Sequence, residues 1–599
     1  MKRKTLLKLL SALSLAPLTS SVLLRPIAAA ARFTRARPGT ARWPGMAQWA
    51  RLRRQVGGRL LKLHSAFAQC SSPSYCAALF KNLRNPFYIN ETPNVTQTLG
   101  WADAWVSQPS VYAVAAASAA DVAAAVNFAR AHNLRVAVRG GGHSYQGTSN
   151  APDSLLIWTH PMNQIVLHES FIPQGCASAP VHAVSVGAGC TWGRVYDAVT
   201  SRGGRYVQGG GCTTVGVAGL VSSGGFGSFS KNFGSAAGGL LEAEVVTADG
   251  NIRIANACQN SDLFWALKGG GGGTFGVITR LTLLTHELPQ QFGAVFGSIK
   301  ANSDAAYREL IERAMTLYAE QLHNEHFGEQ FGFHRSNTLS LGLVTQGLDQ
   351  AALDSIWKPF FDSLRSQLQH YSFPQQLGTI AVPARAWWDA ELIKSVAPQA
   401  IVPDPRAGAN QRDFWWPGDS DQVAQFIYAY ESLWLPSALL NAANRSTLVD
   451  ALFQATRHWS VGLHFNKGLS GAPPDAISRS RETATNPAML DAFALAIIAT
   501  SDQGVYPGVR GHEPNMREAR ESATAIHASM SALRAVVPDG GSYVSEASYF
   551  DQHWQQQYWG SNYSRLAQIK EKYDPTGLFI VHNGVGSENW SRDGFTRLS

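Results

Sequence analysis

The sequence predicts an α+β protein with two main parts, and three observations lead to this prediction. Short strand-like and helix-like patterns alternate between residues 100 and 280, where four glycine-rich loops interrupt them. From 286 to 540 glycine is less frequent, and longer amphipathic stretches alternate with strand-like runs such as SLGLVTQG (340–347). The chain has 599 residues, 45% hydrophobic and 15% charged, which allows large buried cores in two or three domains.

The first predicted unit is a strand, a helix and a second strand. VYAVAAA (111–117) has the composition of a strand, and Ser118 with Asp121 forms a capping box that opens a helix. We expect this helix to end near Ala131. LRVAV (134–138) predicts the second strand, which leads directly into the glycine loop RGGGHS.

Further elements are predicted up to the C-terminus. EAEVVTADGNIRIA (242–255) has alternating apolar residues around Asp249-Gly250, which is a strong hairpin signal. Thr191 and Asn562 are placed to cap helices. Additional strands are predicted at AVSVGAG (183–189), RYVQ (205–208) and VGLHFNKG (461–468), and SDLFWALKGGGGGTFGVIT (261–279) predicts a helix, a glycine run and a strand.

The basic residues are concentrated at the N-terminus. Residues 1–64 hold 14 of the 50 Lys and Arg and none of the 42 Asp and Glu, so the rest of the chain is more acidic than basic. Such a distribution is not typical of a nucleic-acid-binding domain, and we expect no nucleic-acid partner.

Residues 1–31 have the pattern of a signal peptide. Lys2 to Lys4 form a positive start, a mostly apolar run follows to Leu24, and small residues stand at Ala28 to Ala31. A membrane anchor is the alternative, because the apolar run is nearly long enough to span a bilayer. Lys8 and Pro17 interrupt the apolar run, which favours a signal peptide that is removed over a membrane anchor. We therefore expect an exported protein, periplasmic or secreted, without stable membrane association. Residues 32–84 are predicted to be a basic N-terminal extension, in which the Arg-rich piece from Arg32 to Lys62 is poorly ordered.

Six cysteines are few for this length. Cys70 and Cys76 are close enough in sequence to pair in an oxidising compartment. The spacing of the other four matches no zinc pattern, and no metal site is predicted. Those four are Cys176, Cys190, Cys212 and Cys258.

The glycine-rich loops are predicted to approach a ligand closely with their backbone. None has the P-loop or dinucleotide fingerprint. Two of them end in potential nucleophiles, His143 after RGGG and Cys212 after GGG. A hydrogen-bonded structural histidine and a core cysteine are the simpler interpretations. A covalently tethered planar cofactor is the alternative that explains both. The loops cover 140–142, 209–211, 224–227 and 269–273.

Four motifs together resemble the berberine-bridge-enzyme-like flavoproteins of the vanillyl-alcohol-oxidase/PCMH superfamily. They occur in the family's order from about residue 85 to the C-terminus. The resemblance implies a PCMH-type FAD-binding domain of two subdomains over 85–285. It also implies an α+β substrate domain with an antiparallel sheet over 286–540. A C-terminal segment over 541–599 would complete the FAD domain. The motifs are RGGGHSYQG, GGGCTTVGVAGLVSSGGFG, DLFWALKGGGGGTFGVIT and YWGSNYSRLAQIKEKYDPTGLF.

The resemblance implies FAD bound through two covalent bonds. His143 occupies the position that is joined to the 8α methyl of the flavin, and Cys212 the position that is joined to C6. The remaining residues carried over as cofactor contacts are Arg139, Gly140, Gly141, Gly142, Ser144, Gly147, Ser149, Thr214, Gly216, Gly219, Gly224, Gly225, Ile278 and Asn583.

The predicted catalytic residues rest on two comparisons with the family's pattern. Where many members read Y-x-N-Y-x-D, this chain reads YVSEAS (543–548), so Glu546 stands in place of the tyrosine that acts as base. The simpler alternative is a surface glutamate that starts a helix. Tyr543, Tyr549 and His464 are weaker candidates for the catalytic base. Val215 occupies a position where valine accompanies reaction with oxygen.

These residues together predict an FAD-dependent oxidoreductase. Hydride would pass from an alcohol, a sugar or a secondary metabolite to the flavin, with O₂ as the expected electron acceptor. A dehydrogenase of the same fold with another acceptor is one alternative. A flavin-binding or ligand-binding protein without turnover is the other.

Overall fold

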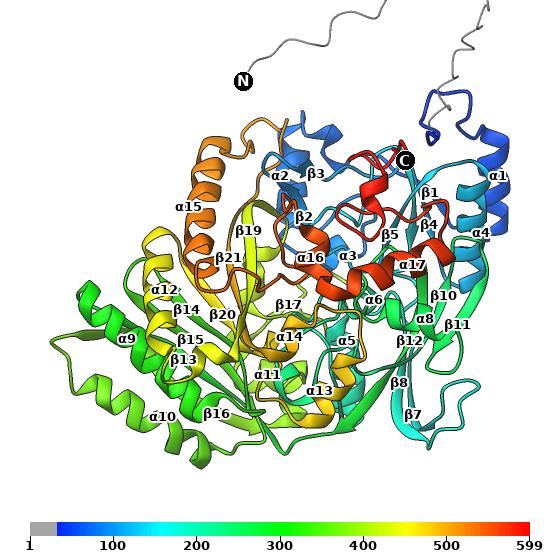
Figure 1. The fold of residues 1–599 in the computed structure, drawn as a ribbon. Coiled ribbons are helices and arrows are strands. Elements are labelled where there is room, and N and C mark those ends of the chain that lie inside the picture. Colours follow the sequence, from blue (N-terminus) through cyan, green and yellow to red (C-terminus); the bar gives the residue numbers. More distant parts are fainter. Residues whose placement is uncertain (1–32, 599) are drawn as a thin grey trace, which may run out of the picture.

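The computed structural model describes residues 33–598, and Figure 1 shows how they are arranged. The signal peptide predicted over 1–31 lies outside these residues. Within the described range, no helix is both long and apolar enough to cross a membrane. The α+β fold class is confirmed, with three main sheets and helices packed around them.

The first sheet has the strand order β1-β4-β6-β5. The predicted strand–helix–strand unit is confirmed, and its helix α4 (Ala119–Ala131) begins as expected, because the Asp121 amide donates to the Ser118 hydroxyl over 3.2 Å. A further strand, β6, lies between β4 and β5 and runs parallel to both. The strands are β1 (Leu60–Lys62), β4 (Tyr112–Ala115), β5 (Arg135–Arg139) and β6 (Ser154–Trp158).

The second sheet is antiparallel, with the order β11-β10-β12-β8-β7 and β9 paired to β12. The hairpin predicted around Asp249-Gly250 is confirmed between β10 and β11. Thr191 precedes α5 (Trp192–Tyr196), but its side chain makes no capping hydrogen bond. The other elements are β7 (Ile165–Phe171), β8 (Val181–Gly187), β9 (Arg205–Val207), β10 (Leu240–Val246), β11 (Ile252–Asn256), β12 (Val277–Glu287), α6 (Val217–Ser222), α7 (Ser230–Phe233) and α8 (Ser261–Leu267).

The third sheet has nine strands in the order β16-β13-β15-β14-β20-β21-β19-β2-β3. All pairs are antiparallel except β19 with β2. Four helices, α9, α10, α12 and α15, cover one face and share a hydrophobic core with it (Figure 1). These elements are β13 (Gln291–Ala301), β14 (Phe327–His334), β15 (Thr338–Gln346), β16 (Tyr371–Pro383), β19 (Gln425–Pro436), β20 (Val461–His464), β21 (Ala492–Gln503), α9 (Asp304–Leu317), α10 (Gln350–Arg365), α12 (Arg445–His458) and α15 (Met516–Arg534).

One segment expected in the FAD domain belongs to the third sheet instead. β2 (Thr98–Trp101) pairs with β19, and β3 (Trp105–Val106) pairs with β2. The strands at 98–106, which lie inside the range 85–285 predicted for the FAD domain, therefore add to the large sheet. The chain crosses to the large sheet before it returns at β4 to the first one.

The expectation of a poorly ordered N-terminal extension is wrong for its described part. Helix α1 (Met46–Gln55) buries Trp49 and Leu52 against α4, and Trp49 stacks on Tyr112 with ring centroids 4.1 Å apart. β1 adds a strand to the first sheet. The arginines of α1 stay outside while its apolar residues share one face, so high charge coexists with a folded helix.

The C-terminal helices α16 (Trp554–Trp559) and α17 (Tyr563–Tyr573) pack on the glycine run after α8. The Trp559 indole donates to the Gly269 carbonyl over 3.0 Å, and the Lys570 ammonium donates to the Thr274 carbonyl over 2.6 Å. Asn562 makes no capping hydrogen bond to α17. The end of the chain therefore fixes the backbone of 269–274.

Two disulfides are present among the described residues. Cys70–Cys76 confirms the pairing that the sequence suggested. Cys176–Cys258 joins residues 82 apart and was not predicted. Cys190 is buried and free, whereas Cys212 is free and partly exposed.

Candidate active site

A cavity of about 690 Å³ lies where the glycine-rich loops, the C-terminal segment and the uncovered face of the large sheet meet. Its volume is in the range of cofactor and ligand sites. Predicted residues that line it are Arg139, Gly140, Gly141, Gly142, His143, Ser144, Ser149, Cys212, Val215, Gly216, Gly219, Ile278, Tyr543, Glu546 and Asn583.

Four predicted cofactor contacts lie behind the wall of the cavity. Gly147 packs on Trp105, and a Cβ there would stand 2.6 Å from the indole. Gly224 and Gly225 have positive φ angles of 102° and 74° and follow the end of α6. The fourth, Thr214, acts on His143 as described below. Of the weaker catalytic candidates, His464 lines the cavity and Tyr549 stacks on His582.

The loop after β5 is held from behind by Arg139. This side chain is buried, and its guanidinium donates to the carbonyls of Ile89, Thr92 and Val95. Gly142 has φ 81°, and a Cβ there would stand 2.7 Å from the Arg139 guanidinium. Arg139 thus supports the loop, and only glycine leaves room for it.

The loops that carry His143 and Cys212 touch through their backbones. A Cβ on Gly141 would stand 2.8 Å from the Gly216 amide, and a Cβ on Gly216 would stand 2.7 Å from the Gly141 amide. Side chains at either position would separate the loops. The glycines therefore bring the two potential nucleophiles to one end of the same cavity.

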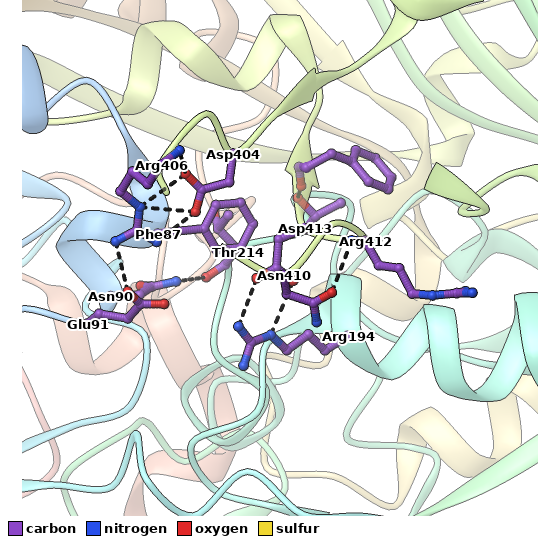
Figure 2. Close-up of polar contacts among 12 residues, drawn as sticks. Phe87, Asn90, Glu91, Arg194, Thr214, Asp404, Arg406, Asn410, Arg412 and Asp413 are labelled. Carbon is purple, nitrogen blue, oxygen red and sulfur yellow. Dashed lines mark hydrogen bonds and ion pairs between the residues drawn. The ribbon is translucent and has the colours of Figure 1, made fainter. Parts of the chain in front are cut away.

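His143 contacts the cysteine loop directly. Its Nε2 lies 3.2 Å from the Thr214 hydroxyl, two residues after Cys212. Burial, together with the positive charge of Arg139, lowers the pKa of His143 to about 4. The imidazole is therefore neutral at ordinary pH. The Asn90 amide fixes Thr214 from the other side, donating to its carbonyl over 3.1 Å (Figure 2).

Cys212 contacts a carboxylate from a distant segment. Its thiol donates to Asp419 Oδ1 over 3.2 Å. Burial, and then the negative charge of Asp419, raise the pKa of the thiol well above its ordinary value. Burial likewise raises the pKa of Asp419 to about 6. Asp419 Oδ2 is buried and has no hydrogen-bond partner among residues 33–598.

The segment 402–422 that carries Asp419 is anchored to the FAD-binding part. It contains β17 (Val402–Pro403), β18 (Phe414–Trp415) and a 3₁₀ turn over 417–422. Figure 2 shows Arg194 of α5 paired through two hydrogen bonds with Asp413, and Arg406 bridging Asp404 and Glu91. These partly buried pairs fix the segment across the glycine loops.

The predicted base Glu546 lies in the cavity and forms an ion pair with Lys467. Only 19% of the glutamate side chain and 10% of the lysine side chain are exposed. The interpretation of Glu546 as a surface residue is therefore wrong. Tyr543 is buried, and its hydroxyl accepts from the Gly225 amide over 3.3 Å.

Sequence reasoning missed three charged residues of this site. Glu329 of β14 lies beside Gly211, accepts a hydrogen bond from Ser228, and has a pKa raised by burial. Asp419 and Lys467 are the other two. Glu329 adopts φ 60°, which is rare outside glycine, but its FGEQFGFH stretch looks like an ordinary strand. No local signal marks any of the three.

The residues present fit a bound FAD. A Cβ on Gly219 would meet no atom within 4 Å, and one on Gly272 would meet none within 3.4 Å, so both backbones border open space. The Thr274 hydroxyl and Gln146 Oε1 line the cavity, are buried, and lack a hydrogen-bond partner among the described residues. Buried polar atoms of this kind are satisfied by a ligand that offers complementary groups.

Comparison with known proteins identifies the family. Residues 110–256 match the family described as "FAD binding domain", and residues 541–586 match "Berberine and berberine like". The FAD-linked oxidoreductase easE of Trichophyton verrucosum is 30% identical, with 93% of this chain and 91% of that protein covered. The chain belongs to the FAD-linked oxidoreductases. The resemblance drawn from the four motifs is confirmed.

Solved structures of flavoproteins have a similar fold. A VAO-type flavoprotein from Myceliophthora thermophila is 25% identical, with a TM-score of 0.75 over 93% of this chain and 98% of that one. Glucooligosaccharide oxidase from Acremonium strictum is 19% identical, with a TM-score of 0.60 over 80% and 92%. The printed title of the latter names a 6-S-cysteinyl, 8α-N1-histidyl FAD.

Proposed function

We propose that this FAD-linked oxidoreductase carries FAD on two covalent bonds and oxidises an alcohol, a sugar or a secondary metabolite, with O₂ as electron acceptor. The observation that carries the proposal is the pairing of His143 with Cys212. Both line one cavity on loops whose backbones touch, and Thr214 connects them. Two isolated structural residues would have no reason to meet there.

His143 is prepared to form its bond through one particular nitrogen. Thr214 engages Nε2, so Nδ1 is the nitrogen that would form the bond to a bound flavin. With its pKa near 4, the ring keeps a free lone pair at neutral pH. A neutral imidazole is the form that can act as nucleophile.

Glu546 is the residue that we assign to proton removal. FAD supplies the hydride acceptor when bound. The Glu546 carboxylate faces the cavity and would accept the proton of the substrate hydroxyl at Oε. Lys467, whose side chain is 10% exposed, offsets the charge of this carboxylate. Glu329 of β14 and Asp419 are further carboxylates that line the cavity.

The cavity favours a ring-shaped polar substrate. The indoles of Trp387 and Trp416 line it with centroids 6.3 Å apart, and aromatic faces of this kind bind the apolar faces of sugars and aromatic rings. Val215 is a small residue in the wall, which leaves access for O₂ in our proposal. The two disulfides support an oxidising compartment and thus export.

An anaerobic substrate screen tests the activity. The purified yellow protein is mixed with sugars, aromatic alcohols and phenolics, and bleaching of the flavin absorption is followed. We expect one class to bleach it and air to restore the colour within seconds. Restoration by a quinone but not by air would show a dehydrogenase, and no bleaching by any class would favour a binding protein.

A further inference from the structure

We propose that Asp419 is the base that removes the proton of Cys212 when this residue becomes attached to the flavin. The inference rests on the proposed covalent binding of FAD through Cys212. It concerns how the bond is made, and Asp419 is therefore a catalytic residue of attachment.

The first observation is the contact between the two groups. The Cys212 thiol already points its proton at Asp419 Oδ1, 3.2 Å away. Burial raises the pKa of the thiol well above its ordinary value, so very little thiolate forms without help. Only the thiolate is a good nucleophile. A neighbouring acceptor for the proton is therefore required.

The second observation is that the Asp419 carboxylate makes no other side-chain hydrogen bond among the described residues. Its Oδ2 is buried without a hydrogen-bond partner among the described residues, and Oδ1 takes only the thiol proton. A bare carboxylate here does not stabilise the fold, since burying an unpaired polar atom costs free energy. Its pKa of about 6 makes it a stronger base than an ordinary aspartate, yet still ionised at neutral pH.

The third observation is that several contacts hold the segment 402–422 directly over Cys212. The Thr213 hydroxyl donates to the Phe414 carbonyl over 2.6 Å, and the Trp416 indole donates to the Gly211 carbonyl over 3.3 Å. The two residues that flank Cys212 are thus each bound to the segment that carries Asp419. The Arg194–Asp413 pair strengthens the same junction (Figure 2).

The step balances with molecular oxygen as oxidant. The Cys212 S–H bond breaks and its proton passes to Asp419 Oδ1, while a bond forms between Sγ and flavin C6. The C6–H bond breaks, and its two electrons pass to O₂. The proton held by Asp419 and the hydrogen lost from C6 leave with the reduced oxygen as H₂O₂. The net change is one thiol, one C6–H and one O₂ converted to one thioether and one H₂O₂.

Asp419→Asn separates basicity from geometry. The amide oxygen still accepts the thiol hydrogen bond, but the group no longer takes up a proton. Asp421→Asn is the matched control, because Asp421 lies exposed in the same turn. Samples of each holoprotein are taken at intervals after expression in air and digested. Mass spectrometry then gives the fraction of the Cys212 peptide that carries flavin.

The expected result is attachment through Cys212 that is at least tenfold slower in Asp419→Asn, normal in Asp421→Asn, and partly restored in Asp419→Glu. The bond to His143 should form in all of them. Attachment in Asp419→Asn at the wild-type rate would overturn the proposal, as would an Asp419→Glu variant no faster than Asp419→Asn. If even the wild-type Cys212 peptide never carries flavin, the proposed bicovalent binding fails instead.

Discussion

Replacing Glu546 by Gln removes the proposed base and leaves Lys467 without its partner. The two side chains are 19% and 10% exposed, so the pair is largely buried but faces the cavity. Removing one partner of a buried ion pair costs about 3–5 kcal/mol, and we expect the lower end, about 3 kcal/mol, because the cavity admits water. Loss of a general base slows its step by about 10²–10⁴-fold.

The double variant Glu546→Gln with Lys467→Met distinguishes the two effects. It removes both charges, so stability should return close to wild type, while flavin reduction stays slow. Thermal unfolding measures the first quantity and stopped-flow anaerobic reduction the second. Glu169→Gln, an exposed glutamate of β7, is the control. A double variant that reduces flavin at the wild-type rate would refute the assignment of Glu546 as base.

Three further predictions follow from the same geometry. Val215→Phe should slow reoxidation by air at least tenfold while reduction by substrate stays near wild type; equal reoxidation rates would remove Val215 from oxygen access. The rate of Cys212 attachment should rise between pH 5 and 7 with a midpoint near 6, because Asp419 ionises over this range. The titratable groups around this pair are Glu329, Lys467 and Tyr145. An attachment rate that does not change with pH would contradict this prediction. Lys231 donates to the carbonyls of Gly468, Ser470 and Phe493, and burial lowers its pKa to about 7. Because the unfolded chain then binds more protons between about pH 7 and 10, the stability of wild type relative to Lys231→Met should rise over that range in denaturant titrations, and a constant difference would show an unperturbed lysine.

The local motifs of the site could be predicted from sequence because their chemistry lies within a few residues. A glycine loop after a strand and before His143 is visible in the order of residues alone. The same holds for the helix capped by Ser118 and for the hairpin at Asp249-Gly250, which the structure confirms.

The rest of the site depends on contacts between distant segments. Asp419 reaches Cys212 across 207 residues, and Lys467 reaches Glu546 across 79. Neither contact has a periodic or local signature, because both join segments that meet only in the folded chain. The order of the N-terminal extension is hidden in the sequence for a related reason. Its positive charge is visible in the sequence. The apolar face formed by Trp49 and Leu52 stabilises the helix only because α4 packs against it in the folded protein.

Peptide mapping of the acid-precipitated protein tests whether FAD is held by two covalent bonds. The structure places His143 and Cys212 on touching loops at one cavity, and we therefore expect a yellow precipitate whose flavin is bonded to the peptides of both residues. A colourless precipitate, with all the FAD free in the supernatant, would contradict it.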